Sequence, residues 1–403
     1  MRTDLFDYRL PPELIAQEPV TPRDASRLLV LPAAGPAGAV GRTAAVGRTA
    51  AMGQTAPMGR TAPMEHRAFR DLPEYLAPGD LLVLNQTRVL RARLLGRKIP
   101  SGGKIEVLLL RPLAAPAALA APADAGSRAW DESWDWETLV RPGRRLPPGA
   151  EIAFPGEGEP RLLGRITGRT PSGGRTVSFQ PARSSETFGQ AVEALGQVPL
   201  PPYITRPLAD AERYQTIFAA VKGSVAAPTA GLHFTPEVFS ALQAKGVPWA
   251  MVTLHIGLDT FRPVREETVE SHRMHSEWYE VPSQTAEAVA QCRGRGGRVV
   301  ACGTTVVRTL EAAADPARSG LVRAGPGETN LFIHPGYRFR VVDLVVTNFH
   351  LPRSTLLMLV SAFGGRERIL EAYREAARLR YRFYSFGDAM LIFPASSAKE
   401  GLS

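Results

Sequence analysis

The spacing of hydrophobic residues differs between the first and second halves of the chain. Between residues 80 and 180, short apolar runs such as DLLVLN (80–85), KIEVLLL (104–110) and RTVSF (175–179) are separated by glycine and proline pairs. Short strands with this turn punctuation are typical of small antiparallel barrels and sandwiches. We therefore predict an antiparallel β-barrel domain at residues 76–182.

From about residue 190 the apolar pattern alternates between helical and extended periods. It predicts helices near 210–221, 236–245, 283–293, 304–314, 354–363 and 366–380, and strands near 248–255, 298–302, 340–347 and 389–393. A repeated order of strand, loop and helix is typical of an α/β domain with a mainly parallel sheet. We expect residues 1–75 and 190–403 to form this domain, with the barrel inserted between them.

Two segments of biased composition interrupt this pattern. Residues 39–62 repeat a hexapeptide (AVGRTA, AVGRTA, AMGQTA, PMGRTA), and residues 112–135 contain an Ala/Pro-rich stretch. Because the hexapeptide segment lacks large apolar side chains, it cannot bury a core of its own. We expect a disordered insertion at 39–62 and a flexible loop at 112–135.

The charge balance of the chain favours a polyanionic partner. Its 403 residues include 48 Lys and Arg against 39 Asp and Glu, a formal net charge of +9. Arginine supplies nearly all of the positive charge, and its planar guanidinium group suits phosphates and base edges. A surplus of this size is typical of nucleic-acid partners. The codon bias of a GC-rich genome is an alternative source of the arginines, so charge alone decides little.

Other bulk features bear on the cellular compartment. No apolar run approaches the roughly 20 residues that a membrane span needs, and the N-terminal sequence lacks the apolar core of a secretory signal. The two cysteines, Cys292 and Cys302, cannot form a disulfide framework. We therefore expect a cytoplasmic protein that does not enter the membrane.

Polar residues follow three predicted strands of the α/β domain. They are Gly303 to Thr305, Asn348 to Ser354 and His255 to Arg262. Ligands of open α/β sheets bind at the carboxyl ends of strands, and a glycine turn before a helix offers free N–H groups to an anion. We expect these loops and the segment around residue 230 to converge on one polar cavity. For each turn alone, a plain helix N-cap is the alternative.

Four loop histidines lie in this domain: His233, His255, His275 and His350. Such a group allows a metal site, but the sequence has no HExxH or His-x-His spacing and no accompanying acidic cluster. It also lacks a GxxxxGK phosphate loop, and its glycine run at 293–297 precedes a strand instead of following one. We therefore expect no metal ligand, and substrate binding in its place.

Distinctive motifs occur along nearly the whole chain outside the two biased segments. The most specific are VAAPTAGLHF (225–234) and the TNFHLP motif within 341–363, and others are PGDLLVLNQTRVLRARL (78–94), CGTTVVRTLE (302–311) and YRFYSFGDAM (381–390). In these motifs the chain resembles the S-adenosylmethionine:tRNA ribosyltransferase-isomerases of queuosine biosynthesis. One position departs from the family: Asp259 stands where many members have glycine in HxGxGTF.

The resemblance implies a fold, a reaction and partners. The family combines an α/β domain with a β-barrel domain and is described as monomeric. Its members transfer the ribosyl group of S-adenosylmethionine to 7-aminomethyl-7-deazaguanine at the tRNA wobble position. They isomerise it to an epoxycyclopentane, which gives epoxyqueuosine-tRNA, and release adenine and methionine. The resemblance thus implies that the partner is a tRNA and that S-adenosylmethionine is a co-substrate, with no other cofactor.

The implied chemistry needs a base that removes a C5′ proton made acidic by the sulfonium, because the resulting ylide would drive ring opening and loss of adenine. Histidine suits this role when its pKa lies near the working pH. The catalytic candidates, which the sequence does not rank, are His233, His255 and His350. The substrate-binding candidates are Asn85, Thr87, Arg88, Thr229, Gly231, Gly257, Gly303, Thr304, Thr305, Arg308 and Asn348. For Arg88 and Arg308, a solvated surface charge is the alternative.

Two other functions fit parts of the sequence. The barrel could bind RNA without catalysis, although aromatic residues make up only 7% of the chain and offer little for base stacking. The loop histidines could serve a metal-dependent hydrolase. Release of adenine separates an enzyme from an RNA-binding protein, and metal analysis tests the hydrolase.

Overall fold

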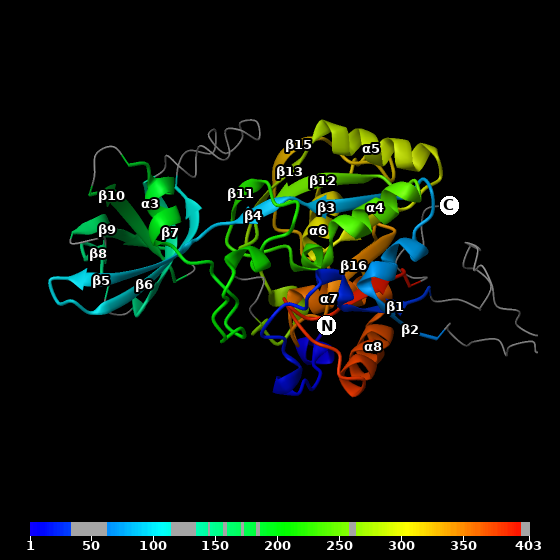
Figure 1. The fold of residues 1–403 in the computed structure, drawn as a ribbon, viewed down its shortest axis with the longest axis horizontal. Helices are drawn as coiled ribbons and strands as arrows, with labels where there is room; N and C mark the ends of the chain where they lie inside the picture. Colours follow the sequence, from blue (N-terminus) through cyan, green and yellow to red (C-terminus); the bar gives the residue numbers. More distant parts are fainter. Residues whose placement is uncertain are drawn as a thin grey trace, which may run out of the picture.

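The computed structural model of the chain has two units, a large α/β unit and a smaller barrel (Figure 1). It describes residues 1–33, 63–113, 134–143, 146–155, 159–170, 173–182, 186–257 and 263–395. The insertion predicted at 39–62 lies outside the described residues, as do Asp259 and residues 114–133 of the predicted loop.

A nine-stranded sheet forms the centre of the α/β unit. In sheet order its strands are β15 (Gly325–Thr329), β13 (Glu277–Val281), β12 (Trp249–Leu254), β3 (Leu81–Asn85), β14 (Val299–Cys302), β16 (Leu344–Asn348), β17 (Ala389–Ile392), β1 (Arg27–Leu31) and β2 (Glu65–Ala68). The middle strands β12, β3, β14 and β16 run parallel to one another, whereas β13, β15, β17 and β2 each form antiparallel pairs. The predicted α/β fold with a barrel is confirmed, and the sheet is mixed, with its parallel part in the middle.

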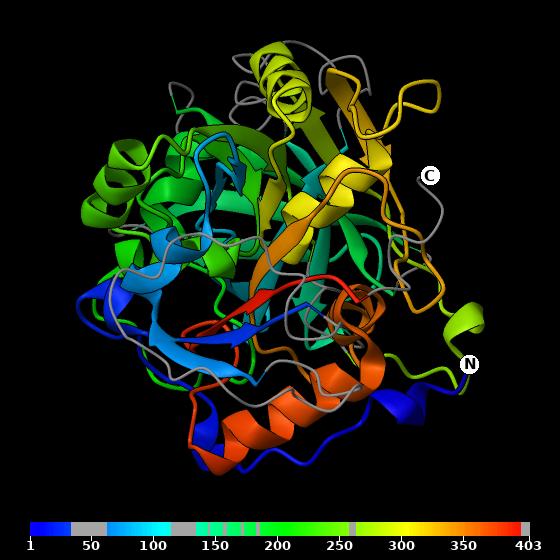
Figure 2. The ribbon, with the colours of Figure 1, turned by 90° about the vertical axis from the view of Figure 1, so that its right-hand side faces the viewer.

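Helices cover both faces of the sheet, so the unit has three layers (Figure 2). They are α4 (Pro236–Ala244), α5 (Ser283–Gly294), α6 (Thr304–Ala312), α7 (Thr355–Gly364) and α8 (Arg366–Arg378). Successive residues of a strand point to opposite faces. In β3, Leu81 and Val83 therefore join the core under α5 to α8, while Leu82 and Leu84 pack with α4.

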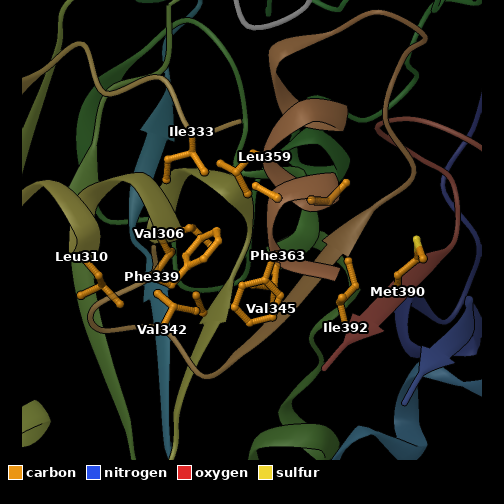
Figure 3. Close-up of a cluster of buried hydrophobic side chains, with 14 of the residues drawn as sticks. Val306, Leu310, Ile333, Phe339, Val342, Val345, Leu359, Phe363, Met390 and Ile392 are labelled. Atoms are coloured by element: carbon orange, nitrogen blue, oxygen red, sulfur yellow. The ribbon is translucent and has the colours of Figure 1, made fainter. Parts of the chain in front are cut away.

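The larger of these cores joins α6 and α7 to the sheet. Figure 3 shows Val306 and Leu310 of α6, Leu359 and Phe363 of α7 and Val345 of β16 as parts of one apolar cluster. These side chains are at most 1% exposed. Because the sheet and two helices share this core, the ends of β14 and β16 are held in fixed positions.

Short 3-10 helices complete the α/β unit. They are η1 (Thr3–Phe6), η2 (Pro12–Leu14), η3 (Arg23–Ala25), η4 (Phe69–Tyr75), η6 (Ala211–Tyr214), η7 (Thr229–His233) and η9 (Val269–Ser271). In the part of the chain that the structure describes, no helix combines the length and the apolar character needed to cross a membrane.

The smaller unit is a closed barrel of antiparallel strands. Around the barrel they are β10 (Arg175–Pro181), β7 (Asp135–Arg141), β6 (Lys104–Pro112), β5 (Arg93–Ile99), β8 (Glu151–Pro155) and β9 (Pro160–Arg169). Alternate residues point inwards, as Ile105, Val107 and Leu109 of β6 do. Helix α3 (Phe188–Leu195) packs on this core through Phe188, whose ring stacks on Trp136 at 5.2 Å.

The chain passes between the two units twice. On the way out, β4 (Thr87–Val89) pairs in parallel with β11 (Val221–Ser224), which lies on the returning chain (Figure 1). A small core that includes Val89, Ile204 and Tyr214 fills the junction. The α/β unit and the barrel are therefore joined by a packed connection as well as by two passages of the chain.

The structure places DLLVLN (80–85) differently from the sequence interpretation, which assigned it to the barrel. Residues 81–85 form β3 in the middle of the large sheet, and the barrel strands begin at Arg93. All five residues of β3 are buried. A continuous apolar run is typical of a parallel strand covered on both faces, whereas barrel strands alternate.

The helix predicted at 210–221 is wrong. Only 211–214 are helical, as the 3-10 helix η6. Tertiary hydrogen bonds take the place of helical ones after it: the Gln215 side chain bonds both backbone groups of Val89, at 3.0 and 2.8 Å, and the Ala220 N–H donates to the carbonyl of Gln86 at 2.8 Å. The junction between the units thus overrides the local helical preference.

Candidate active site

Loops that follow three of the parallel strands surround one cavity at the carboxyl edge of the sheet. Strands β12, β14 and β16 supply these loops, and η7 closes one side. The lining residues are Tyr203, Ala227, Pro228, Thr229, Ala230, Ile256, Gly303, Thr304, Thr305, Thr347, Asn348, Phe349, His350, Leu351, Leu356, Tyr384 and Ser385. The predicted convergence of the segments near residues 230, 255, 303 and 350 is therefore confirmed.

The space enclosed by these side chains is small, about 40 Å³. Pockets for small organic ligands are usually on the order of 300–1,000 Å³. A nucleoside-sized ligand therefore has to extend through the mouth of the cavity or displace part of its lining.

Helix α6 begins at the cavity wall. Gly303 is its N-cap at φ 95°, a backbone conformation that favours glycine, and no side chain caps the helix. Within the described residues, the N–H groups of Thr304 and Thr305 have no backbone acceptor. Both threonines line the cavity. The helix N-terminus therefore offers free donors to an anion there.

A chain of hydrogen bonds leads from the cavity wall into the protein. Thr229 donates to the side-chain oxygen of Asn348 at 2.9 Å, and the amide nitrogen of Asn348 lies 3.1 Å from Nε2 of His233. On the far side, Nδ1 of His233 lies 2.7 Å from the hydroxyl of Ser26, and the ring stacks on Phe69 at 4.9 Å. His233 is thus fully engaged behind Asn348 and does not line the cavity.

His350 does line the cavity. Its Nε2 lies 2.8 Å from the hydroxyl of Thr347, while its backbone N–H and carbonyl bond the hydroxyls of Tyr373 and Tyr8. Its Nδ1 has no hydrogen-bond partner among the described residues. Of the three predicted catalytic histidines, His350 alone lines the cavity, and one of its ring nitrogens has no hydrogen-bond partner among the described residues.

His255 is held next to the cavity. Its Nδ1 lies 2.8 Å from the hydroxyl of Thr87, and its ring stacks on Trp278 at 5.1 Å. The opposite edge of the ring lies against Gly223, where an added Cβ would come within 2.3 Å of Nε2. Ile256, the next residue, reaches the cavity wall. His255 therefore helps to position that wall.

Burial lowers the pKa of all three histidines. The pKa falls to about 3 for His233, about 4 for His255 and about 3 for His350. Desolvation is the largest cause for each, and the nearby guanidinium groups of Arg382 and Arg23 add to it for His233. The imidazoles are therefore neutral at physiological pH. Which of the three serves as the expected base stays a prediction.

Asn85 ties three elements together at the end of β3. Its side-chain oxygen accepts from the N–H groups of Thr87 and Leu254 at 3.1 and 3.2 Å. Its nitrogen donates to the carbonyl of Leu254 at 3.0 Å and to the hydroxyl of Thr305 at 3.4 Å. Asn85 and Thr87 are at most 1% exposed. Both hold the strand ends in place and do not line the cavity.

Arg308 lies in the protein interior, so neither expected role, an anion contact or a solvated charge, matches its place. It forms a buried ion pair with Glu277 and donates to the carbonyl of Leu331 at 3.1 Å. Glu277 also accepts from the N–H of Gly257 at 2.9 Å. Arg308 and Gly257 are therefore connected through Glu277 and act on the cavity only through the elements that they hold.

Two further candidates lie away from the cavity lining. Arg88 is on β4 and forms a 2.5 Å ion pair with Glu212 at the junction of the units. Gly231 lies within η7, where an added Cβ would come within 2.8 Å of the Phe218 ring and 2.9 Å of Thr216. The glycine is required by this close packing.

The sequence interpretation missed the aromatic side of the cavity. Tyr203 and Ser385 hydrogen-bond each other at 2.7 Å, and both line the cavity with Tyr384. Tyr384 has φ 72°, an uncommon value for a residue with a side chain. The YRFYSFGDAM motif contains Tyr384 and Ser385, but only the fold shows that they face the loop after β16.

Metal-binding side chains do not gather in the described parts of the chain. No group of three or more His, Cys, Asp or Glu residues is placed there to hold an ion. Both cysteines, Cys292 and Cys302, are buried and unpaired with each other.

Comparison with known proteins gives one consistent result. The family model described as "Queuosine biosynthesis protein" matches residues 3–43 and 55–392. An S-adenosylmethionine:tRNA ribosyltransferase-isomerase from Moorella thermoacetica is 51% identical over 392 residues, which cover 97% of this chain and 100% of the relative. The protein of the same name from Symbiobacterium thermophilum is 50% identical over 392 residues, with the same coverage.

A solved structure is also similar. The crystal structure of S-adenosylmethionine tRNA ribosyltransferase from Thermotoga maritima shares 40% sequence identity, and the match covers 96% of this chain and 100% of that one, with a TM-score of 0.48.

Proposed function

Because the chain belongs to the queuosine biosynthesis protein family, we propose that it transfers the ribosyl group of S-adenosylmethionine to 7-aminomethyl-7-deazaguanine at the tRNA wobble position. It is an enzyme of the transferase class. In the proposed reaction the ribosyl group is isomerised, the product is epoxyqueuosine-tRNA, and adenine and methionine are released. The resemblance inferred from motifs such as VAAPTAGLHF (225–234) is confirmed at the level of the family.

The cavity at the carboxyl edge of the sheet carries this proposal. Its lining includes the first residues of α6, whose N–H groups are free, and His350, whose Nδ1 has no hydrogen-bond partner among the described residues. A substrate with a carboxylate and an acidic C–H group needs this pair of features, an anion site and a proton acceptor.

We assign the anion site to Gly303, Thr304 and Thr305. The N-terminus of a helix attracts negative charge, because its N–H groups are unpaired and the helix dipole is positive there. The methionine carboxylate of S-adenosylmethionine is a suitable anion. Thr229 and Asn348, on the same wall, supply further polar contacts, and His233 fixes the orientation of the Asn348 amide.

We assign the proton acceptor to His350. When Nε2 donates to Thr347, the lone pair of Nδ1 is free to take a proton from C5′ of the ribosyl group. Burial lowers the pKa of His350 to about 3, which keeps the imidazole neutral but makes the imidazolium unfavourable. A carboxylate bound at α6 would offset that effect through its opposite charge.

The test uses tRNA that carries 7-aminomethyl-7-deazaguanine. The protein is incubated with this tRNA and S-adenosylmethionine, released adenine is measured by chromatography, and digested tRNA is examined by mass spectrometry. We expect the amount of released adenine to equal the amount of modified nucleoside that is converted to epoxyqueuosine. Binding of the tRNA without either product would instead indicate a non-catalytic RNA-binding protein. Activity that disappears with a chelator would point to a metal-dependent reaction.

A monomeric state and a cytoplasmic location stay predictions. Light scattering of the purified protein tests the first, and fractionation of the source cells tests the second. The first follows from the resemblance and the second from the sequence composition.

A further inference from the structure

One face of the barrel carries more positive charge than its own carboxylates balance. The face is formed by β5, β6 and β7, where Arg93, Arg97, Lys104 and Arg141 surround a single carboxylate, Glu106. We call these five residues the basic barrel face. Strand pairing places them together: Arg97 lies opposite Lys104, and Glu106 lies opposite Arg141.

Three of the four positive charges of this face have no carboxylate partner in the part of the chain that the structure describes, although Arg97 donates to the carbonyl of Gly102 at 3.2 Å. Glu106 pairs with Arg93 at 2.8 Å. Among the described residues, Arg97, Lys104 and Arg141 have no ion pair with a carboxylate. Like charges directly opposite each other destabilise a strand pair, so the Arg97–Lys104 pair weakens the barrel. An arrangement that costs stability in the free protein indicates a ligand of the opposite charge.

Two adjoining grooves run along the basic barrel face. One of about 750 Å³ lies between the face and the segment 196–208, and it is lined by Arg91, Arg93, Arg141 and Arg206 among others. The second, of about 800 Å³, is lined by Arg97 and Lys104. Both grooves include Glu106 and Arg141, so they form one continuous surface.

The segment 196–208 separates this surface from the candidate active site. Tyr203 lines the cavity of the site, while its neighbours Pro202 and Ile204 line the first groove. Figure 1 shows this part of the chain, in green, running between the barrel and the α/β unit. A nucleic acid with one base at the mouth of the cavity would therefore carry its adjoining backbone past the basic barrel face.

We propose that the basic barrel face binds the phosphate backbone of the RNA substrate next to the nucleotide held at the mouth of the cavity. The inference rests on the proposed function, because it takes a tRNA as the substrate. Phosphate contacts fix the position and register of a nucleic acid without reading its sequence. None of the described residues lining the two grooves is aromatic, so the surface suits backbone phosphates and not stacked bases.

The test removes two unpaired charges from the face in the double variant Arg97→Gln/Arg141→Gln. The matched control is Arg165→Gln/Arg169→Gln, which removes two exposed arginines from β9, three strands around the barrel from β6. Affinity for a tRNA transcript is measured by fluorescence anisotropy between about 50 and 300 mM salt. Across this range, affinity that comes from phosphate contacts falls as the salt concentration rises. KM and kcat are measured with tRNA bearing 7-aminomethyl-7-deazaguanine.

We expect the first variant to bind tRNA about tenfold or more weakly at about 100 mM salt. The slope of log affinity against log salt should fall by roughly 0.7–0.9 for each phosphate that the variant no longer neutralises. KM for tRNA should rise while kcat stays within about twofold. The control should keep its affinity within about twofold. The melting temperature of the first variant should change little, because Arg97→Gln relieves the like-charge pair with Lys104 while Arg141→Gln removes the positive charge opposite Glu106.

Equal weakening of tRNA binding in both variants, or unchanged binding in the first, would overturn the inference. If the true partner of the face is an acidic protein, tRNA binding by the Arg97→Gln/Arg141→Gln variant will be unchanged. The proposed function is tested separately: wild-type protein that binds tRNA through this face but releases no adenine would refute the function and leave the surface standing. If wild-type protein releases adenine and the Arg97→Gln/Arg141→Gln variant binds tRNA as tightly as wild type, the function stands and the surface is refuted.

Discussion

Glu277 and Arg308 form an ion pair that is buried on both sides, with side chains 8% and 4% exposed. The pair joins β13 to α6, and Glu277 also holds the N–H of Gly257 in the loop after β12. One carboxylate therefore holds the loop after β12 and ties α6, the helix that follows β14, to β13.

The variant Glu277→Gln should be strongly destabilised. It keeps the shape and an oxygen for Gly257, but it leaves the Arg308 charge buried without a counter-charge. Breaking a buried pair in this way costs about 3–5 kcal/mol. The change in the free energy of unfolding is measured by denaturant unfolding of the α/β unit, with tryptophan fluorescence as the signal.

The control for this variant is Asp7→Asn, which breaks the ion pair between Asp7 and Arg353. The two side chains of this pair are 42% and 47% exposed, respectively. A surface pair contributes only about 0–1 kcal/mol, so the midpoint should hardly move. Similar midpoints for Asp7→Asn and Glu277→Gln would show that the buried pair has no special part in stability.

The variant Gly223→Ala should displace His255. Its Cβ would lie 2.3 Å from Nε2 of the imidazole, and the stacking on Trp278 leaves the ring little room to move. Overpacking of this kind typically costs about 1–3 kcal/mol. We expect a lower melting temperature together with reduced adenine release.

Gly294→Ala is the matched control, because an added Cβ at the end of α5 meets nothing within 4 Å. It should be neutral or slightly stabilising. A Gly223→Ala protein that melts like the Gly294→Ala protein would mean that the His255 side chain adapts freely.

Acidification should destabilise the protein through its buried histidines. The pKa of a histidine is about 6.5 in the unfolded chain, but burial lowers it to about 3 for His233 and His350 and about 4 for His255. Below about pH 6.5 the unfolded state binds more protons than the folded state, so stability falls as pH drops towards about 3. At about pH 5, each of the three histidines lowers the free energy of unfolding by about 2 kcal/mol.

Unfolding midpoints at about pH 8, 7, 6 and 5 measure this effect. In His350→Gln and in His233→Gln, stability should decline less steeply between about pH 7 and 5 than in wild type. This holds even if the variant is less stable than wild type at about pH 8. A decline of unchanged steepness in both variants would assign the acid sensitivity to other groups.

His350→Gln should lower turnover with a smaller effect on substrate binding. Loss of a proton acceptor typically reduces the rate about 10²–10⁴-fold. The control is His272→Gln, since His272 pairs with Glu266 outside the cavity lining. Adenine release under saturating S-adenosylmethionine and tRNA, with circular dichroism as a check on folding, gives the comparison. Full turnover in His350→Gln would remove this residue from the proton transfer.

Local patterns along the chain were enough to predict the fold class, the family and the segments that build the site. Apolar period and turn residues suffice for helices such as α6 and α7 and for the barrel strands, because these follow local patterns. The motifs around residues 230, 255, 303 and 350 could be placed together because parallel strands carry their ligand loops at one edge. Of the predicted site residues, Thr229, Gly303, Thr304, Thr305, Asn348 and His350 line the cavity.

Which polar residues are free for a ligand could be seen only in the folded chain. In the sequence His233, His255 and His350 are equivalent, and Asn85 and Arg308 look like substrate contacts. The fold engages the ring nitrogens of His233 and packs His255 against Trp278, and it leaves Nδ1 of His350 open. The physical reason is that a side chain's availability depends on partners far away in the chain, such as Asn348 for His233, and no local pattern encodes such pairs.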